Sequence, residues 1–361
     1  MSSLYIMATI VGESGAKKEF LERINDLLKV YTVHKLEDIN RLKKSIPQDI
    51  ERKRLEIKKT LENEKIKLLN NLSILKNNIE TIEAETEKEI NEDIKEVKNS
   101  IEKLDSKLNI DSVLDYLKYP AIKLELSLKK KELNDMILSK ESRIKERSSD
   151  LRIKLTRYQD RLRQITENFQ EIVEYNLRDM YSDLDIVNNL EKHGLLSYYK
   201  GAIGEDTVIS IIDKNFDEWY VLINNFNFSL PEPVRYHDSW IRNSQLDHVL
   251  VCPKGVFAIE TKSWSDAYIN KVFSDGDFTP IQQIERNCYA LYKLLNDHKI
   301  SYSEIKVKAL LISTDKKIPT PQESYVTSIT CTYLGKYLKQ RPDKLNHKQI
   351  NVIIKKLSYF I

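Results

Sequence analysis

The sequence predicts an α+β protein in which a long antiparallel α-helical coiled-coil hairpin precedes an α/β domain with a central mixed sheet. Three observations support this fold class. Residues 17–193 contain no glycine and only two prolines, Pro47 and Pro120, a composition that suits long helices and not a β-sandwich or barrel. Apolar residues in this half recur at coiled-coil spacing. From Gly194 onward, strand-like and helix-like segments alternate.

The composition excludes several classes of protein. The 361 residues include 58 Lys and Arg against 55 Asp and Glu, a net charge of +3, and 41% of the residues are hydrophobic. This balance argues against a histone-like or acidic-tail protein and against wholesale disorder. The three cysteines are widely spaced and form no Cys-x-x-Cys pair, so the sequence predicts no zinc site or disulfide framework. We therefore expect a cytoplasmic protein.

Residues 1–36 are expected to form an N-terminal helical segment. They include an apolar run from Leu4 to Val11, which lacks a basic flank and is too short to span a bilayer. We interpret this run as a helix or strand that packs on another part of the chain. No later apolar run in the sequence reaches the length of a membrane span, so we expect no membrane partner.

Residues 37–193 are expected to form the coiled-coil hairpin arm. Leu, Ile and Val recur in steps of three and four from Leu68 to Leu108, apart from a stutter at Thr86. A second run repeats every seven residues from Ile137 to Ile172. The remaining positions are rich in Lys and Glu, which is typical of a solvated helix face. We infer that the arm extends the reach of the protein, binds a partner or mediates oligomerisation, and that it performs no chemistry.

The turn of the hairpin is placed at about 109–120, because Pro120 disfavours a helical conformation in the residue before it. Two helices over about 48–108 and 121–190 then run antiparallel. With about sixty residues at 1.5 Å each, the arm reaches roughly 90 Å. A parallel dimer of two separate coiled coils is the alternative, and the similar lengths of the two runs favour the hairpin.

Residues 194–361 are expected to form a compact domain with basic C-terminal helices. Its last part, 301–361, contains 11 basic and 4 acidic residues. This excess suits contact with a phosphate backbone, and a solvated basic helix explains it equally well. The expected helices cover 204–215, 281–296 and pieces after 333, and the expected strands lie near 219–228, 245–252, 256–262 and 307–313.

Two of these strands bring a chemically suggestive set of side chains together. They are joined by a Pro/Gly turn, so Asp247 near the start of the first strand should lie beside Glu260 near the end of the second. Strand alternation directs Glu260 and Lys262 to one face and Thr261 to the other. Two carboxylates with the backbone carbonyl of Thr261 suit a hard divalent cation. Such an ion promotes phosphodiester hydrolysis, while Lys262 orients water or stabilises developing charge.

Four motifs in this order resemble the nuclease-related domain (NERD) family, a branch of the PD-(D/E)xK nuclease superfold, over about 197–335. The resemblance implies that Asp247 and Glu260 ligate Mg²⁺ (or Mn²⁺), that Lys262 is the catalytic lysine, and that Glu205 and Gln283 line the site. The motifs are Gly-x-x-Gly-Glu at 201–205, Gln-Leu-Asp-His at 245–248, Gly-Val-Phe-Ala-Ile-Glu-Thr-Lys at 255–262 and Pro-x-x-Gln-x-x-x-Asn at 280–287.

Two residues of these motifs keep an alternative role. The sequence departs from the family at Leu246, where a β-branched residue is usual, and after Lys262. Glu205 also fits a first-turn residue stabilised by its helix dipole, and His248 should point away from the metal face as a structural residue. After Lys262 the chain reads Ser263-Trp264-Ser265, where the family more often has Asn and Gly. This difference concerns the rim of the site and leaves the metal set intact.

The leading functional hypothesis is a Mg-dependent phosphodiesterase, an endonuclease that hydrolyses DNA and uses its arm for partner binding or homo-oligomerisation. By analogy of fold alone, such a protein suits defence against foreign DNA, such as that of a phage, or repair. The alternative is a coiled-coil scaffold or sensor whose nuclease-like domain binds nucleic acid without cutting. The complete set of Asp247, Glu260 and Lys262 favours the enzyme.

Overall fold

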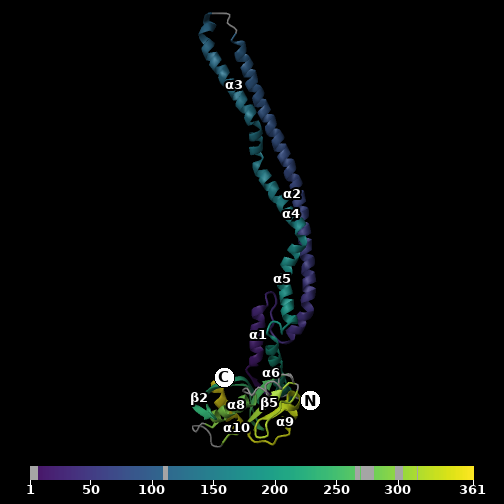
Figure 1. Cartoon of the computed structure of the whole chain (residues 1–361), viewed down its shortest axis with the longest axis vertical. Coiled ribbons are helices and arrows are strands. Elements are labelled where there is room, and N and C mark those ends of the chain that lie inside the picture. The colour runs from purple at the N-terminus through teal and green to yellow at the C-terminus, as the bar shows by residue number, and fades with distance from the viewer. Residues whose placement is uncertain (1–6, 109–112, 265–268, 270–279, 297–303, 315) are drawn as a thin grey trace, which may run out of the picture. The chain divides into compact units, whose positions relative to one another are not determined.

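The computed structural model confirms the α+β fold class, with long helices and one mixed six-stranded sheet (Figure 1). The chain divides into two compact units, one made of residues 1–48 and 179–361 and the other of residues 49–178. The structure describes residues 7–108, 113–264, 269, 280–296, 304–314 and 316–361.

The unit formed by residues 49–178 is an antiparallel helical hairpin. Its first side belongs to α2 (Glu37–Ser106), and its second side is formed by α3 (Val113–Arg147), α4 (Ser149–Glu167) and the start of α5 (Phe169–Asn188) (Figure 1). Ion pairs join the two sides from Arg161 to Glu64 at 2.8 Å, from Arg152 to Glu83 at 2.6 Å and from Lys140 to Glu87 at 2.7 Å. Residue numbers rise along one side as they fall along the other, which requires antiparallel helices.

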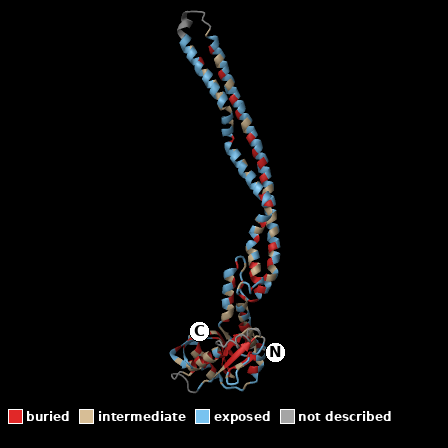
Figure 2. Cartoon of the chain, viewed as in Figure 1, coloured by how far each residue is buried: buried red, intermediate tan, exposed pale blue. Residues whose placement is uncertain are grey.

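The hairpin is held together by an apolar seam along α2, which is the buried stripe in Figure 2. Thr86 marks the stutter and is itself buried, and its hydroxyl donates to the carbonyl of Ile82 at 2.7 Å. No helix among the described residues is both long and apolar enough to cross a membrane. The buried seam residues are Leu61, Leu68, Leu72, Leu75, Ile79, Ile90, Val97 and Leu104.

The second side of the hairpin is not the single helix expected over 121–190, because breaks at Ser148 and Asn168 divide it. Ser148 is fully buried, and its hydroxyl donates to Glu83 Oε1 at 2.6 Å. Arg152 donates two hydrogen bonds to the same oxygen. The bonds from Ser148 and Arg152 lower the pKa of Glu83. The break is therefore stabilised by a contact across the hairpin, for which the local sequence contains no glycine or proline signal.

The position of the turn also differs from the expected 109–120. Helix α3 already begins at Val113 and contains Pro120. Proline removes one backbone donor from a helix but need not end it, and Pro120 is exposed. The expected reversal of direction at Pro120 is therefore wrong, and residues 109–112 of the expected turn lie outside the described part of the chain.

The N-terminal segment belongs to the larger unit and is not wholly helical. Strand β1 (Thr9–Val11) pairs in parallel with β2, and α1 (Gly15–Leu27) follows it. Phe20 of α1 is fully buried, and its ring centre lies 5.1 Å from that of Tyr199. Residues 9–11, the end of the apolar run, thus add an edge strand to the sheet.

The sheet of the larger unit has the order β1-β2-β3-β4-β5-β6. Strands β2, β3 and β4 are antiparallel neighbours, whereas β4, β5 and β6 are parallel. After β1, the strands of the sheet are β2 (Val221–Tyr236), β3 (Ser239–Cys252), β4 (Gly255–Lys262), β5 (Val307–Ser313) and β6 (Thr327–Thr330). The change from antiparallel to parallel pairing occurs at β4, the strand that ends with Glu260 and Lys262.

Helices cover both faces of the sheet. Helices α8 (Pro280–Leu295) and α10 (His347–Leu357) pack on one face, and α6 (Leu196–Asn215) and α9 (Cys331–Lys339) pack on the other. Along β4, Val256 and Ala258 belong to the first core, whereas Phe257 and Ile259 belong to the second. This alternation places Glu260 on the α8 side and Thr261 on the α6 side.

Strands β2 and β3 extend beyond their expected bounds and form a long ribbon over residues 229–244. The pairing shifts register between Ser229 and Val234, and His237 in the turn has φ 49°. Pro231 and Pro233 lie within this part of β2. Because proline is confined to edges and irregular positions of sheets, these two residues hid the strand from sequence-based prediction.

Buried Asp183 of α5 fixes the chain that follows α1. It is 0% exposed, and its carboxylate accepts the backbone N–H groups of Lys29, Val30 and Tyr31 at 2.9, 2.8 and 3.0 Å. One turn earlier, Asp179 pairs with the Lys29 ammonium at 3.1 Å, with both side chains largely exposed. The two aspartates differ in burial and in what they bind, which makes them a matched pair.

We expect Asp183→Ala to lower the free energy of unfolding by about 3 kcal/mol, because it removes a buried acceptor and leaves three backbone donors without it. Asp179→Ala should cost at most about 1 kcal/mol, since it breaks an exposed ion pair. Urea unfolding of the full chain, followed by circular dichroism, measures both. Equal losses in the two variants would contradict the anchoring role of Asp183.

Candidate functional site

The pairing of β3 with β4 places Asp247 beside the end of β4. His248 pairs with Ile259 in the antiparallel register, and the backbone N–H of Thr261 donates to Asp247 Oδ2 at 2.7 Å. Burial raises the pKa of Asp247, while the charge of Lys262 and this hydrogen bond oppose the shift. The backbone of one strand thus fixes the carboxylate of the other.

Glu260 is the most deeply buried carboxylate of the site, at 2% exposed. Its Oε1 accepts hydrogen bonds from Lys262 Nζ at 2.6 Å and from Gln283 Nε2 at 2.7 Å. Its Oε2 is buried and has no partner among the described residues. Burial and the charge of Asp247 raise the pKa of Glu260 to about 8. A buried acceptor without a donor is costly, so this oxygen marks the place where a cation or a water would be stabilised.

Lys262 lies between the two carboxylates and the rim. Burial opposes its charge, yet Glu260 and Asp247 raise its pKa above the usual value. Its ammonium also lies 6.0 Å from the ring centre of Trp264. Lys262 therefore stays protonated and is held beside Glu260.

Glu205 reaches the site from α6 and is held mainly by the N-terminal segment. Its Oε2 accepts the Ser14 hydroxyl at 2.8 Å and the Ala16 backbone N–H at 3.3 Å. Burial and the charge of Asp247 raise its pKa to about 7. The sequence contains a signal for Ser14 as the residue that caps α1. It contains no signal that Ser14 would contact Glu205, which lies 191 positions away in the sequence.

Two other motif residues have structural roles. His248 is fully buried, its Nδ1 lies 2.7 Å from Asn224 Oδ1, and burial lowers its pKa to about 3. It therefore remains neutral and within the protein core. Gly204 lets α6 approach the sheet, since a Cβ there would lie 3.1 Å from Thr261 Cγ2 and 3.2 Å from Thr314 Cγ2.

The donor set suits a divalent cation that keeps much of its water. Within the described residues, no three His, Cys, Asp or Glu side chains form a metal-binding group. Asp247 is near enough for its charge to oppose the ionisation of Glu260, and Glu260 Oε2 has no partner among the described residues. Mg²⁺ is commonly bound through one or two carboxylates, with water in its other positions. The residues present fit such an ion better than one that needs an all-protein cage.

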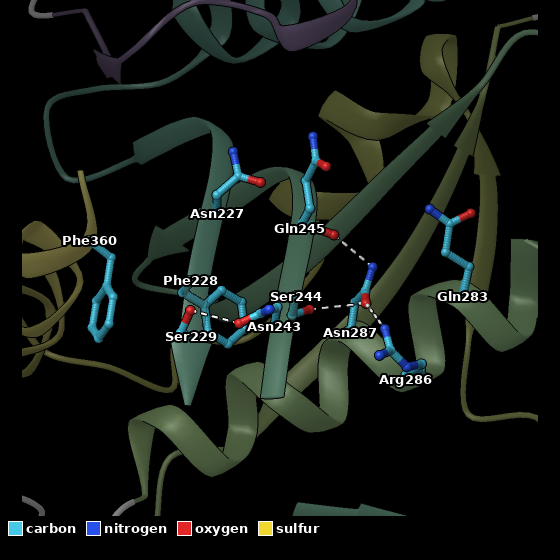
Figure 3. Close-up of a pocket in the computed structure, with 10 residues that line it drawn as sticks. All are labelled: Asn227, Phe228, Ser229, Asn243, Ser244, Gln245, Gln283, Arg286, Asn287 and Phe360. Atoms are coloured by element: carbon cyan, nitrogen blue, oxygen red, sulfur yellow. Dashed lines mark hydrogen bonds between the residues drawn. The ribbon is translucent and has the colours of Figure 1, made fainter. Parts of the chain in front are cut away.

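Next to these residues lies an open cavity of about 930 Å³, bordered by β2, β3 and α8 (Figure 3). Gln283 lines this cavity and also donates to Glu260. Ser229, Asn243 and Ser244 of the remaining lining belong to the ribbon of residues 229–244, which sequence-based reasoning missed. The neighbouring lining residues on β2 and β3 lie in strands that were expected. The site is therefore larger than the four motifs indicate.

Residues 200–314 match the family model of the nuclease-related domain (NERD). This match confirms the resemblance carried by the four motifs, and it spans Glu205, Asp247, Glu260, Lys262 and Gln283. Comparison with curated proteins and with solved structures finds no match. The chain thus contains a nuclease-related domain, which indicates a nuclease-related function for this part of the larger unit.

Two glycines of α6 allow the packing of this site to be tested. A Cβ at Gly201 would meet Ala16 Cβ at 3.6 Å, an ordinary contact. Gly201→Ala should raise the free energy of unfolding by up to about 1 kcal/mol through its higher helix propensity. Gly204→Ala should lower it by about 1 kcal/mol, because the new methyl group presses against two strand-borne methyl groups. Thermal unfolding of both variants measures the difference, and equal effects would contradict the close approach at Gly204.

Proposed function

We propose that the nuclease-related domain is a metal-dependent nuclease that hydrolyses phosphodiester bonds, with DNA as its substrate. The observation that carries this proposal is the buried carboxylate of Glu260. One of its oxygens binds Lys262 and Gln283, and the other has no partner among the described residues. Asp247 adds a second carboxylate at the same sheet edge. Two carboxylates and a lysine in this arrangement suit phosphoryl transfer to water.

Each residue of the set has a distinct proposed role. Asp247 and Glu260, with the backbone carbonyl of Thr261, would hold Mg²⁺ or Mn²⁺, and such an ion polarises a phosphoryl group and acidifies water. Lys262 would orient the attacking water or stabilise the charge that develops on the phosphate. Gln283 would keep the Glu260 carboxylate in place through its 2.7 Å hydrogen bond. Glu205, with a pKa of about 7, would hold or release a proton near neutral pH.

The rest of the chain supports contact with nucleic acid and with partners. The segment 301–361 carries an excess of basic residues, which we propose contacts the phosphate backbone. We propose that the helical hairpin binds a protein partner or a second copy of the chain. Defence against foreign DNA in the cytoplasm is the role that would unite a nuclease with such an arm.

A second candidate function is nucleic-acid binding without cleavage, in a scaffold or sensor. One observation favours it: the ammonium of Lys262 lies 2.6 Å from Glu260 and partly neutralises the carboxylate that a cation would need. In this case the arm would be the functional element, and the nuclease-like site would serve recognition. The two candidates differ in their response to metal ions and in turnover.

We expect the purified chain to cleave plasmid DNA in the presence of Mg²⁺ or Mn²⁺. Asp247→Ala and Lys262→Ala should each lower the rate at least about 100-fold, as the loss of a charge-stabilising group does in other enzymes. Lys254→Ala is a matched control, because Lys254 lies at the opposite end of the β3–β4 hairpin and pairs with Asp343. Cleavage that survives in Asp247→Ala would overturn the assignment.

Metal binding can be measured independently of cleavage. A divalent ion at about 100 times its dissociation constant should stabilise the folded chain by about 2.7 kcal/mol, which thermal unfolding detects. Asp247→Asn should abolish the Mg²⁺ or Mn²⁺ effect, while Asp343→Asn should keep it. A wild-type chain that shows no shift with either metal would favour the non-cleaving candidate.

A further inference from the structure

The cavity beside the site is a groove whose floor is formed by residues 227–229 of β2 and 243–245 of β3, where the β2–β3 ribbon begins. Figure 3 shows the ribbon between Phe360 on one side and the residues of α8 on the other. Amide side chains dominate its polar lining, and none of its described lining residues is acidic. A surface of this kind offers hydrogen-bond donors and acceptors without repelling an anion.

The amides that β2 and β3 contribute to the groove are only partly used by the protein. Asn227 Nδ2 donates to the carbonyl of Asn225 at 3.1 Å, Gln245 Nε2 donates to Asn225 Oδ1 at 3.1 Å, and Asn243 Oδ1 accepts from Ser229 at 2.8 Å. In each of the three lining amides, the other polar end has no partner within the described residues. These three side chains are exposed. They form a set of prepositioned hydrogen-bonding groups, which is what recognition of a base edge requires.

Arg286 supplies the positive charge of the groove. It is half-buried, and its one hydrogen bond within the described chain is a long one, 3.5 Å, to Asn287 Oδ1. None of the described carboxylates forms an ion pair with it. An arginine held in this way suits a phosphate, which its planar guanidinium binds through two donors.

Helix α8 connects the groove to the hydrolytic site. Gln283, Arg286 and Asn287 lie at spacings of three and four and therefore share one face of the helix. Gln283 donates to Glu260, whereas Asn287 donates to the carbonyl of Gln245 at 2.7 Å and accepts from Ser244 at 3.0 Å. Arg286 and Asn287 lie about one helical turn, ~5.4 Å, along α8 from Gln283, which lines the groove and contacts Glu260. This step corresponds to about one or two nucleotides at ~3.4 Å each.

We propose that this groove binds an unpaired nucleic-acid strand that leads into the site. Arg286 holds a phosphate next to the scissile one, and Asn227, Asn243 and Gln245 hydrogen-bond to base edges. The proposal rests on the proposed nuclease function and names its substrate as single-stranded or locally unpaired nucleic acid. Phe360 closes the far side of the groove as an apolar wall for a base.

The groove suits a single strand better than a duplex for two reasons. A ribbon that reads the major groove of a duplex must project into it, whereas this part of the ribbon is flanked by Phe360 and α8. Duplex binding also depends on neutralising many phosphates, and Arg286 is the one cationic side chain among the described lining residues. The amide groups and the single arginine of the groove instead suit the binding of a few nucleotides whose bases are accessible.

The experiment measures binding of a fluorescent oligonucleotide to the full chain in EDTA, by anisotropy, where no metal-dependent cleavage occurs. We expect a single strand to bind at least about tenfold more tightly than the blunt duplex of the same sequence. Asn227→Ala combined with Asn243→Ala should weaken single-strand binding about tenfold, within the range for lost base contacts. Arg286→Gln should lower the affinity and reduce the salt dependence by about one phosphate contact.

Arg242→Gln is the matched control for charge, because Arg242 is exposed on β3 beside Asn243 and does not line the groove. Binding like that of the wild type in this control, with losses in the groove variants, supports the proposal. Equal or tighter binding of the duplex, or groove variants that bind a single strand like the wild type, overturns it.

A cleavage assay on the same oligonucleotides separates this proposal from the nuclease function. Metal-dependent cleavage that is lost in Asp247→Ala, together with unchanged binding and cleavage in the groove variants, rejects the groove and retains the nuclease. Selective single-strand binding that requires Arg286, without cleavage of any substrate, retains the groove and rejects the nuclease. DNA and RNA oligonucleotides are both included, since the proposal concerns an unpaired strand of either nucleic acid.

Discussion

The site depends on one interaction, the hydrogen bond from the Thr261 backbone to the Asp247 carboxylate at 2.7 Å. It forms because β3 and β4 pair in a register that opposes His248 to Ile259. A slip of one residue would turn Glu260 from the α8 side to the α6 side and separate it from Gln283. The buried cores on both faces of β4 prevent such a slip, since Val256 and Phe257 occupy different cores. Ordinary hydrophobic packing thereby determines the position of charged groups.

Burying Glu260 and Glu205 near Asp247 is unfavourable, and the surrounding structure compensates for it. Lys262 and Gln283 support Glu260, whereas Ser14 and the first turn of α1 support Glu205. The N-terminal segment is therefore part of the site's support, although it is distant in sequence from the nuclease-related motifs. Its strand β1 completes one edge of the sheet that carries them, so sheet and site are assembled from both ends of the chain.

Local sequence patterns predicted the features that depend on local physics. The seam of α2, the strand β5 over 307–313 and the pairing of β3 with β4 follow from periodicity and turn residues. The features that were missed depend on distant partners. The break at Ser148 is stabilised by Glu83 across the hairpin, and Ser14 meets Glu205 only in the folded chain. The ribbon around Pro231 and Pro233 pairs despite residues that disfavour strands, and the extension of β2 and β3 was missed for that reason.

The charges of the site explain why a cation and Lys262 need not compete. Asp247 and Glu260 contribute two carboxylates against the single ammonium of Lys262, and Glu205 stands close enough to be affected by the charge of Asp247. Lys262 binds Oε1 of Glu260 and leaves Oε2 without a partner among the described residues. A second positive charge at Oε2 would thus reduce an excess of negative charge and would not require Lys262 to leave. Burial is the main reason that the pKa values of Glu205 and Glu260 are raised, and the charge of Asp247 adds to it. A desolvated carboxylate near another negative charge holds its proton more tightly.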